Sequence, residues 1–358
     1  MPLRERNTDP GAVELDNSAP ALDDPAGNRV AVFSGNTTRA NLIRLELPMP
    51  VGLGLASSHA PVVAAPLDQW EGLYRRFAAR VPQPSTAALE TGEVRRSHFD
   101  RIQKAFVTLR ERIDLYRPEL FIIVGGDQSE MFDASNVPNL MLYLGEEAWA
   151  DVPSAGEQGD GVERLNLRVD AQTSKRLLDK LVKEADFDIA ISTEQRHLGP
   201  RGRGLPHAFF RPVPLLLSDG EMPCVLLYEN TYDSPSLSAQ RCYELGTAIA
   251  NLLRDDPRRI AIYGSGGLSH DPGGPRSGWI DRPLDEWFLA RLAEGDGRAT
   301  TVMYSFDSMT MRGGTGEMRA WITVAGAMEA MGSRATVVDY VPSHHAVTGL
   351  AWASWETS

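Results

Sequence analysis

The chain contains little cysteine and no long apolar run. Its 358 residues include only 2 cysteines, Cys224 and Cys242, and their spacing fits neither a C-x-x-C redox pair nor a zinc knuckle. No stretch approaches the roughly 18 consecutive apolar residues that a membrane-spanning helix needs. Residues 1–30 also lack the apolar segment of a signal peptide. These absences favour a cytoplasmic protein, and we expect no membrane partner.

Basic residues are also scarce relative to acidic ones. The chain has 36 Lys and Arg against 48 Asp and Glu, which gives a net charge of −12. A nucleic-acid backbone or an anionic membrane surface attracts proteins with the opposite balance, so both are excluded as expected partners. A small anionic substrate is not excluded, because a single Arg or Lys inside a pocket decides that interaction.

The distribution of apolar residues predicts an α/β fold, with a mostly buried central sheet flanked by helices. We expect residues 1–30, which are rich in Pro, Asp and Asn, to form a poorly structured N-terminal extension, and residues 31–358 to form a single domain. The expected strands are Val30–Ser34, Leu42–Leu47, Pro50–Ala56, Leu120–Val124, Leu165–Val169, Pro223–Tyr228, Arg259–Gly264 and, as the final strand, Arg334–Val341. The expected helices are Pro66–Val81, Ser97–Leu115, Asp170–Glu184, Ser236–Leu253, Leu284–Glu294 and Glu317–Met331.

Histidine is scarce as well, with 7 residues in the chain. Three of them, His59, His207 and His270, follow an apolar strand or lie in a loop rich in Gly and Pro. Such positions project side chains into a cleft from a rigid base. A single histidine in such a place is more often a structural hydrogen-bonding group than a ligand, so position alone is a weak indication of function.

Five short motifs occur together in a fixed order. They are His59-Ala-Pro, Gly125-Gly-Asp-Gln128, Gly204-Leu-Pro-His207, Gly267-Leu-Ser-His270 and Gly316-Glu-Met-Arg-Ala-Trp321. In this arrangement the chain resembles the class III extradiol ring-cleavage dioxygenases, the family of the protocatechuate 4,5-dioxygenase β subunit. The likeness runs from about Gly52 to Tyr340, and its most specific parts are the segments GGLSH and GTGEMRAWITVAGAM.

The resemblance implies a role for each matching residue. His59 matches the first iron-ligand histidine of the family, and Glu317 matches the carboxylate ligand. His270 matches the histidine that acts as acid and base, and His207 matches a histidine near the substrate. Relatives in this family commonly associate, so the resemblance also implies a homo-oligomer.

Gln128 departs from the family pattern, because the family's other ligand histidine belongs at this position. Three interpretations are open: the amide oxygen of Gln128 ligates the metal weakly, Glu130 takes its place, or the metal is lost. The intact surroundings favour a working variant of the site. A site with more oxygen ligands would bind iron(II) less tightly and accept manganese(II) more readily.

The chemistry implied by the resemblance explains these residue types. Iron(II) held on one face by two neutral ligands and a carboxylate keeps its other positions open for a catecholic substrate and O₂. A base must take a phenolic proton and an acid must later return one. Histidine titrates near neutrality and performs both steps, so His270 is the candidate.

Three further residues are candidates for substrate binding. Asp127 directly precedes Gln128 at the end of an expected strand. Arg203 lies in the basic stretch Arg196–Arg211, which is either a solvated loop or a lid that meets a substrate carboxylate. His345 is either one of two adjacent surface histidines or, as the resemblance implies, a group near the active site.

The leading functional hypothesis is a non-haem iron(II) dioxygenase. It would insert both atoms of O₂ into a catechol-, gallate- or aminophenol-like ring with extradiol cleavage. Two alternatives remain: a non-catalytic binding or regulatory relative, and a different metal-dependent reaction on the same scaffold.

Overall fold

A computed structural model describes residues 21–23, 29–31, 49–78, 80–153, 162–195, 204–217 and 221–357. The chain divides into two compact units, Met1–Pro48 and Met49–Ser358. In the first unit, β1 (Ala21–Asp23) pairs with β2 (Arg29–Ala31) in antiparallel fashion.

Two expectations concern segments that the structure covers poorly or not at all. The strand expected over Leu42–Leu47 lies outside the described residues, as do residues 32–34 of the strand expected over Val30–Ser34. The division into an extension over residues 1–30 and one catalytic domain over residues 31–358 stays a prediction.

An eight-stranded sheet forms the centre of the second unit, in the order β11-β12-β3-β10-β4-β9-β5-β8. Its strands are β3 (Val51–Ser57), β4 (Leu120–Gly125), β5 (Leu140–Tyr143), β8 (Ala190–Ser192), β9 (Cys224–Glu229), β10 (Ile260–Ser265), β11 (Ala335–Ser343) and β12 (Thr348–Glu356). β3, β10, β4 and β9 are neighbours and run parallel. A separate antiparallel pair joins β6 (Glu147–Pro153) to β7 (Val162–Arg168).

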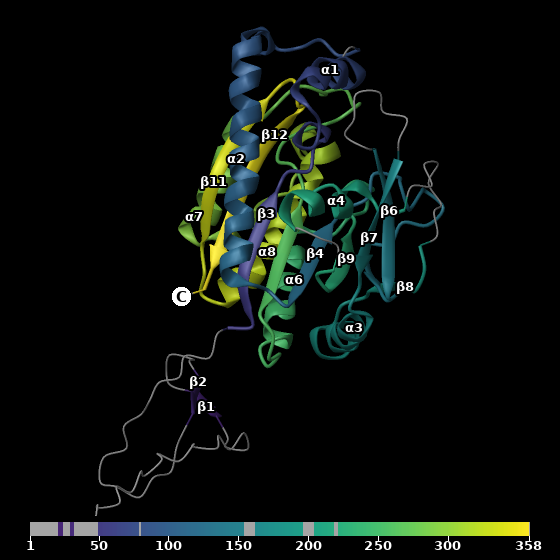
Figure 1. The fold of residues 1–358 in the computed structure, drawn as a ribbon, viewed down its shortest axis with the longest axis vertical. Helices are drawn as coiled ribbons and strands as arrows, with labels where there is room; N and C mark the ends of the chain where they lie inside the picture. The colour runs from purple at the N-terminus through teal and green to yellow at the C-terminus, as the bar shows by residue number, and fades with distance from the viewer. Residues whose placement is uncertain are drawn as a thin grey trace, which may run out of the picture. The chain divides into compact units, whose positions relative to one another are not determined.

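Helices cover both faces of the sheet, which confirms the predicted α/β class (Figure 1). They are α1 (Trp70–Ala78), α2 (Gly92–Tyr116), α3 (Ala171–Ala185), α4 (His207–Phe210), α5 (Val213–Leu216), α6 (Ala239–Leu252), α7 (Arg282–Glu294) and α8 (Met318–Ala330). One core cluster packs α3, α6, α7 and α8 on one face, and the other packs α2, α4 and α5 on the opposite face. Among the described residues, no helix has the length and apolar character needed to cross a membrane.

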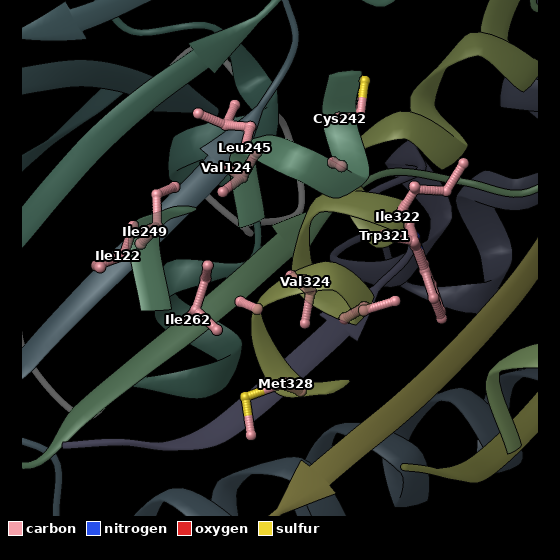
Figure 2. Close-up of a cluster of buried hydrophobic side chains, with 14 of the residues drawn as sticks. Ile122, Val124, Cys242, Leu245, Ile249, Ile262, Trp321, Ile322, Val324 and Met328 are labelled. Carbon is pink, nitrogen blue, oxygen red and sulfur yellow. The ribbon is translucent and has the colours of Figure 1, made fainter. Parts of the chain in front are cut away.

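The alternation of side chains along the strands explains the two layers. In β4, Ile122 and Val124 belong to the cluster with α6 and α8, while Phe121 and Ile123 belong to the cluster with α2. Successive residues of a strand point to opposite faces of the sheet, so a continuous apolar run is buried on both faces. Figure 2 shows part of the first of these layers, with Val124 of β4, Leu245 of α6 and Val324 of α8 among its buried side chains.

Most expected elements are confirmed with shifted ends, but one expectation is wrong. Arg334–Val341 is not the final strand, because β12 follows it and lies between β11 and β3. The helix expected from Pro66 begins at Trp70 after a short 3-10 turn. The last helix begins at Met318, so Glu317 is its N-cap residue.

Candidate metal centre

Four neighbouring strands bring their carboxyl ends to one edge of the sheet. His59 follows β3, Gln128 follows β4, Tyr232 follows β9, and the segment that ends in His270 follows β10. Because these strands are parallel and adjacent, their following loops converge. The sheet topology therefore places side chains from distant parts of the chain around one point.

Glu317 reaches the same point from α8, and glycines in β10 and the loop after it make this approach possible. A Cβ atom on Gly264 would lie 2.7 Å from the Ala320 carbonyl oxygen, and one on Gly266 would lie 2.7 Å from the Glu317 carbonyl oxygen. Only glycine allows two backbones to pack this closely. The start of α8 thus lies directly against β10 and the Gly266-Gly267 turn.

His59 and Glu317 face each other in a buried environment. Nε2 of His59 lies 3.3 Å from Oε1 of Glu317, and both side chains are only 3% exposed. On its other side, Nδ1 of His59 contacts Ser265 Oγ at 2.9 Å. His59 Nε2 has no hydrogen-bond partner among the described residues. Buried polar atoms are nearly always satisfied, so this nitrogen is oriented for a ligand.

His207 is the third member of this cluster. One potential ligand atom from each of His59, His207 and Glu317 lies within 4.8 Å of the others. The two imidazole rings meet edge to face, with their centroids 4.6 Å apart. Two neutral imidazoles and one carboxylate are the donor set of non-haem iron(II) sites, so the described residues fit such an ion.

Glu130 lies behind His207 and fixes its orientation. Oε2 of Glu130 accepts hydrogen bonds from the His207 backbone N–H at 2.8 Å and from Nδ1 at 2.7 Å. Burial would raise the pKa of Glu130, but His207 lowers it to about 2, so the carboxylate is ionised. Burial lowers the pKa of His207 to about 4 against the opposing effect of Glu130, so its ring is neutral at pH 7.

Gln128 donates hydrogen bonds within this centre. Its Nε2 donates to Glu317 Oε1 at 2.9 Å and to the Tyr232 hydroxyl at 2.7 Å. The second oxygen of Glu317, Oε2, accepts the backbone N–H of Gly267 at 2.7 Å. Although burial opposes ionisation, the nearby His59 and His270 hold the pKa of Glu317 well below its ordinary value.

His270 lies on the other side of Glu317. Its Nδ1 donates to the Leu268 carbonyl oxygen at 2.7 Å, and its Nε2 lies 3.5 Å from Glu317 Oε2. Burial alone would lower the pKa of His270, but Glu317 and the Leu268 carbonyl raise it. A Cβ atom on Gly314 would collide with the imidazole, so a glycine leaves room for the ring.

The structure describes two of the three expected substrate-binding residues, Asp127 and His345. The Asp127 carboxylate accepts the backbone N–H groups of Glu130, Met131 and Phe132, so its visible role is to shape the turn after β4. Burial raises the pKa of Asp127 to about 6 in spite of these hydrogen bonds. Arg203 lies outside the described residues. The substrate roles of these residues and of His345 stay predictions.

His345 is buried, so the interpretation of the two adjacent histidines as surface residues is wrong for it. Its Nδ1 lies 2.8 Å from Glu90 Oε2, its Nε2 lies 2.9 Å from Arg95 Nη1, and its ring stacks on Tyr74. These contacts account for both ring nitrogens and one face of the ring within the protein.

Two residues of the centre were missed in the sequence. Ser265 is the last residue of β10, and Tyr232 lies three residues beyond the end of β9. Both obey the rule that functional groups gather at the carboxyl ends of parallel strands. Neither serine nor tyrosine is distinctive at such a position, so the sequence alone offers only this weak signal.

Comparison with known proteins identifies the family. The family described as the catalytic LigB subunit of aromatic ring-opening dioxygenase matches residues 82–351, a range that contains every residue of the centre except His59. A 2,3-dihydroxyphenylpropionate/2,3-dihydroxicinnamic acid 1,2-dioxygenase of Photorhabdus laumondii is 27% identical over 190 residues, which cover 53% of this chain and 55% of that protein. Gallate dioxygenase of Pseudomonas putida is 32% identical over 157 residues, which cover 42% of this chain and 45% of that protein.

The 2,3-dihydroxyphenylpropionate/2,3-dihydroxicinnamic acid 1,2-dioxygenase of Burkholderia vietnamiensis is 23% identical over 289 residues, which cover 68% of this chain and 85% of that protein. The match to the Photorhabdus and Pseudomonas proteins spans about half of their length. The family match, in contrast, extends over most of this chain. The chain therefore belongs to the family of catalytic LigB subunits of aromatic ring-opening dioxygenases, as its resemblance to the class III extradiol enzymes implied.

Proposed function

We propose that this chain is a non-haem iron(II) dioxygenase that opens a catechol-, gallate- or aminophenol-like ring by extradiol cleavage. The observation that carries the proposal is the buried His59 Nε2, which has no hydrogen-bond partner among the described residues and lies 3.3 Å from Glu317 Oε1. Two donor atoms so close together, one of them anionic, are arranged to share a cation. The names of the two first-described relatives support an aromatic substrate.

When bound between His59 and Glu317, iron(II) would supply the electron exchange between an aromatic diol and O₂. Manganese(II) is the second candidate, because carboxylate and water ligands also suit it. The carboxylate of Glu317 contributes the negative charge that a divalent cation needs, and the surrounding burial strengthens that interaction. The Gly267 N–H fixes the orientation of this carboxylate.

His270 would move the protons of the reaction. Its Nδ1 keeps a proton in the hydrogen bond to the Leu268 carbonyl oxygen, so Nε2 is the atom that exchanges one. A phenolic hydroxyl of the substrate would give its proton to Nε2, and the same nitrogen would later return it to an oxygen of the product.

Oxygen uptake tests this function. The purified chain would be loaded with iron(II) without air and mixed with a panel of catechols, gallate and aminophenols. We expect about one O₂ consumed per substrate, incorporation of both oxygen atoms by product mass, and a yellow ring-opened product. Glu317→Gln keeps the shape of the side chain and removes its charge, and it should abolish uptake. Metal-loaded protein without uptake across the panel would instead favour a non-catalytic relative.

A further inference from the structure

We infer that His207 supplies the third protein ligand of the metal, while Glu130 positions His207 and Gln128 supports the ligand Glu317. This inference rests on the proposed function only in so far as a divalent cation binds at His59 and Glu317. It assigns a ligand on α4, although the sequence pattern places the third ligand after β4. Three observations carry it, one for each possible third ligand: Gln128, Glu130 and His207.

The first observation concerns Gln128. Its amide nitrogen donates to Glu317 Oε1 at 2.9 Å and to the Tyr232 hydroxyl at 2.7 Å. An ionised carboxylate only accepts hydrogen bonds, so the side of the amide that faces Glu317 must be the NH₂ group. An amide nitrogen of this kind has no lone pair for a metal. Gln128 therefore acts on the cation indirectly, by orienting the carboxylate of Glu317.

The second observation concerns Glu130. Its Oε2 accepts both the backbone N–H of His207 at 2.8 Å and the imidazole Nδ1 at 2.7 Å. Moving this carboxylate to the metal would break both hydrogen bonds and leave two donors of His207 without this partner, which buried polar groups strongly disfavour. Glu130 is therefore retained behind the imidazole and does not compete with it for the metal.

The third observation is the parallel between His207 and His59. In both residues Nδ1 is occupied, by Glu130 Oε2 in one case and by Ser265 Oγ in the other. A proton on Nδ1 leaves the lone pair of the neutral ring on Nε2, which is the usual state of a metal-bound histidine. The ligand atoms of His59, His207 and Glu317 lie within 4.8 Å of one another. This set keeps two neutral donors and one anion without any contribution from residue 128.

Counting the imidazoles on a bound metal tests the inference without any turnover. The full chain would be loaded with manganese(II), and pulsed EPR would count the imidazole nitrogens coupled to the ion. We expect two in the wild type and one in His207→Ala, with two retained in Gln128→Ala and His270→Ala. One imidazole in the wild type, or a count that His207→Ala leaves unchanged, would overturn the inference. Binding without oxygen uptake would contradict only the proposed function.

Metal affinity provides a second measurement. Titration with cobalt(II), followed by its visible absorption, should show a loss greater than about 100-fold in His207→Ala. Glu130→Gln, whose amide oxygen still accepts hydrogen bonds, should lose less cobalt(II) affinity than Glu130→Ala. Each loss should be about 10- to 100-fold at most, and the imidazole count should be unchanged. His98→Ala removes a half-buried histidine of α2, to which no role at the centre is assigned, and is the matched control, for which we expect wild-type affinity. If Gln128→Ala weakens binding more than His207→Ala does, the inference is wrong.

If His207→Ala does not fold, His207→Gly with added imidazole replaces it. Free imidazole should fill the space of the missing ring and restore cobalt(II) binding in a saturable way. Restoration supports His207 as a ligand. A folded His207→Gly protein that binds cobalt(II) as tightly as the wild type without imidazole refutes it.

Discussion

Asp285 predicts a pH dependence of stability that can be traced to one buried carboxylate. This side chain of α7 is fully buried and accepts hydrogen bonds from the Ser269 N–H at 2.8 Å, the Ser269 hydroxyl at 2.9 Å and the Tyr340 hydroxyl at 2.8 Å. Burial raises its pKa from 3.8 to about 6, in spite of these three hydrogen bonds. Because Ser269 directly precedes His270, the same contacts support the loop that carries His270.

The direction of this pH dependence follows from the number of protons that the folded and the unfolded state bind. Between about pH 4 and pH 6 the folded state holds a proton on Asp285 that the unfolded state has lost, so this group favours folding most strongly at low pH. That contribution is lost as the pH rises through the folded pKa of about 6. A difference of roughly two pKa units corresponds to about 3 kcal/mol, of which about 2–3 kcal/mol falls between about pH 8 and pH 4.

Urea unfolding of the wild type and Asp285→Asn at a series of pH values measures this contribution. The asparagine has the same shape, its oxygen can accept the Ser269 N–H, and its NH₂ can donate to the two hydroxyl groups. We expect the wild type to gain about 2–3 kcal/mol relative to the variant as the pH falls from about 8 to about 4. Other titrating groups, including Asp127, are present in both proteins and cancel. A difference that stays constant over this range, or that falls with the pH, would refute the assignment of a raised pKa to Asp285.

Three further predictions concern the metal centre and its surroundings. Gly314→Ala places a methyl group against the His270 ring, so we expect at least about a tenfold loss of turnover at saturating substrate. The control is Gly72→Ala, in an exposed and open position of α1, which should leave turnover unchanged. In urea unfolding this control should be more stable than the wild type by about 0.5–1 kcal/mol. Ser265→Ala removes the partner of His59 Nδ1, so cobalt(II) titration should show about a 10- to 100-fold weaker affinity with the imidazole count unchanged. Iron(II) at about 100 times its dissociation constant should raise the free energy of unfolding by about 2.7 kcal/mol, and a chelator should reverse the gain. An unaltered Gly314→Ala enzyme, a normal affinity in Ser265→Ala, or a stability that does not respond to metal would contradict the respective prediction.

The central elements of the fold could be predicted because their local pattern and their final environment agree. Leu120–Val124 is a continuous apolar run, and β4 is buried on both faces in the structure. The helix expected over Ser97–Leu115 carries its buried residues Ile102, Phe106, Leu109 and Ile113 at helical spacing. In both cases burial follows from the order of the residues alone.

β12 could not be predicted with the same means. Its residues Thr348–Glu356 are fully buried up to Trp355, but they combine Gly, Ala and Trp in a sequence without strong β-branched content. Such a segment becomes a strand because β11 and β3 pair with it on both sides. Whether a segment forms a strand depends largely on such neighbouring strands, and the residue pattern of the segment itself does not reveal them.

The candidate metal centre was also predictable from the sequence only in part. His59, His270 and Glu317 stand in recognisable motifs at strand or helix ends, and the structure brings them together. The contact between Glu130 and His207 joins residues that are 77 positions apart, and neither lies in a motif that indicates the other. Long-range pairs of this kind depend on the packing of α4 against the end of β4, which local spacing does not encode.

The charge of the donor set explains why a ligand could move from one element to another within this fold. One carboxylate and two neutral imidazoles that converge on a point suit a divalent cation, whichever strand or helix carries them. With glutamine at position 128, an ionised Glu130 two residues later lies behind His207 and directs its ring toward His59 and Glu317. Restoring a histidine at position 128 alone would therefore place a third imidazole beside Glu317 and remove the hydrogen bond that Gln128 donates to it. We expect Gln128→His to increase metal affinity more in the His207→Ala variant than in the wild type. Equal effects in the two backgrounds would show that the two positions do not substitute for each other.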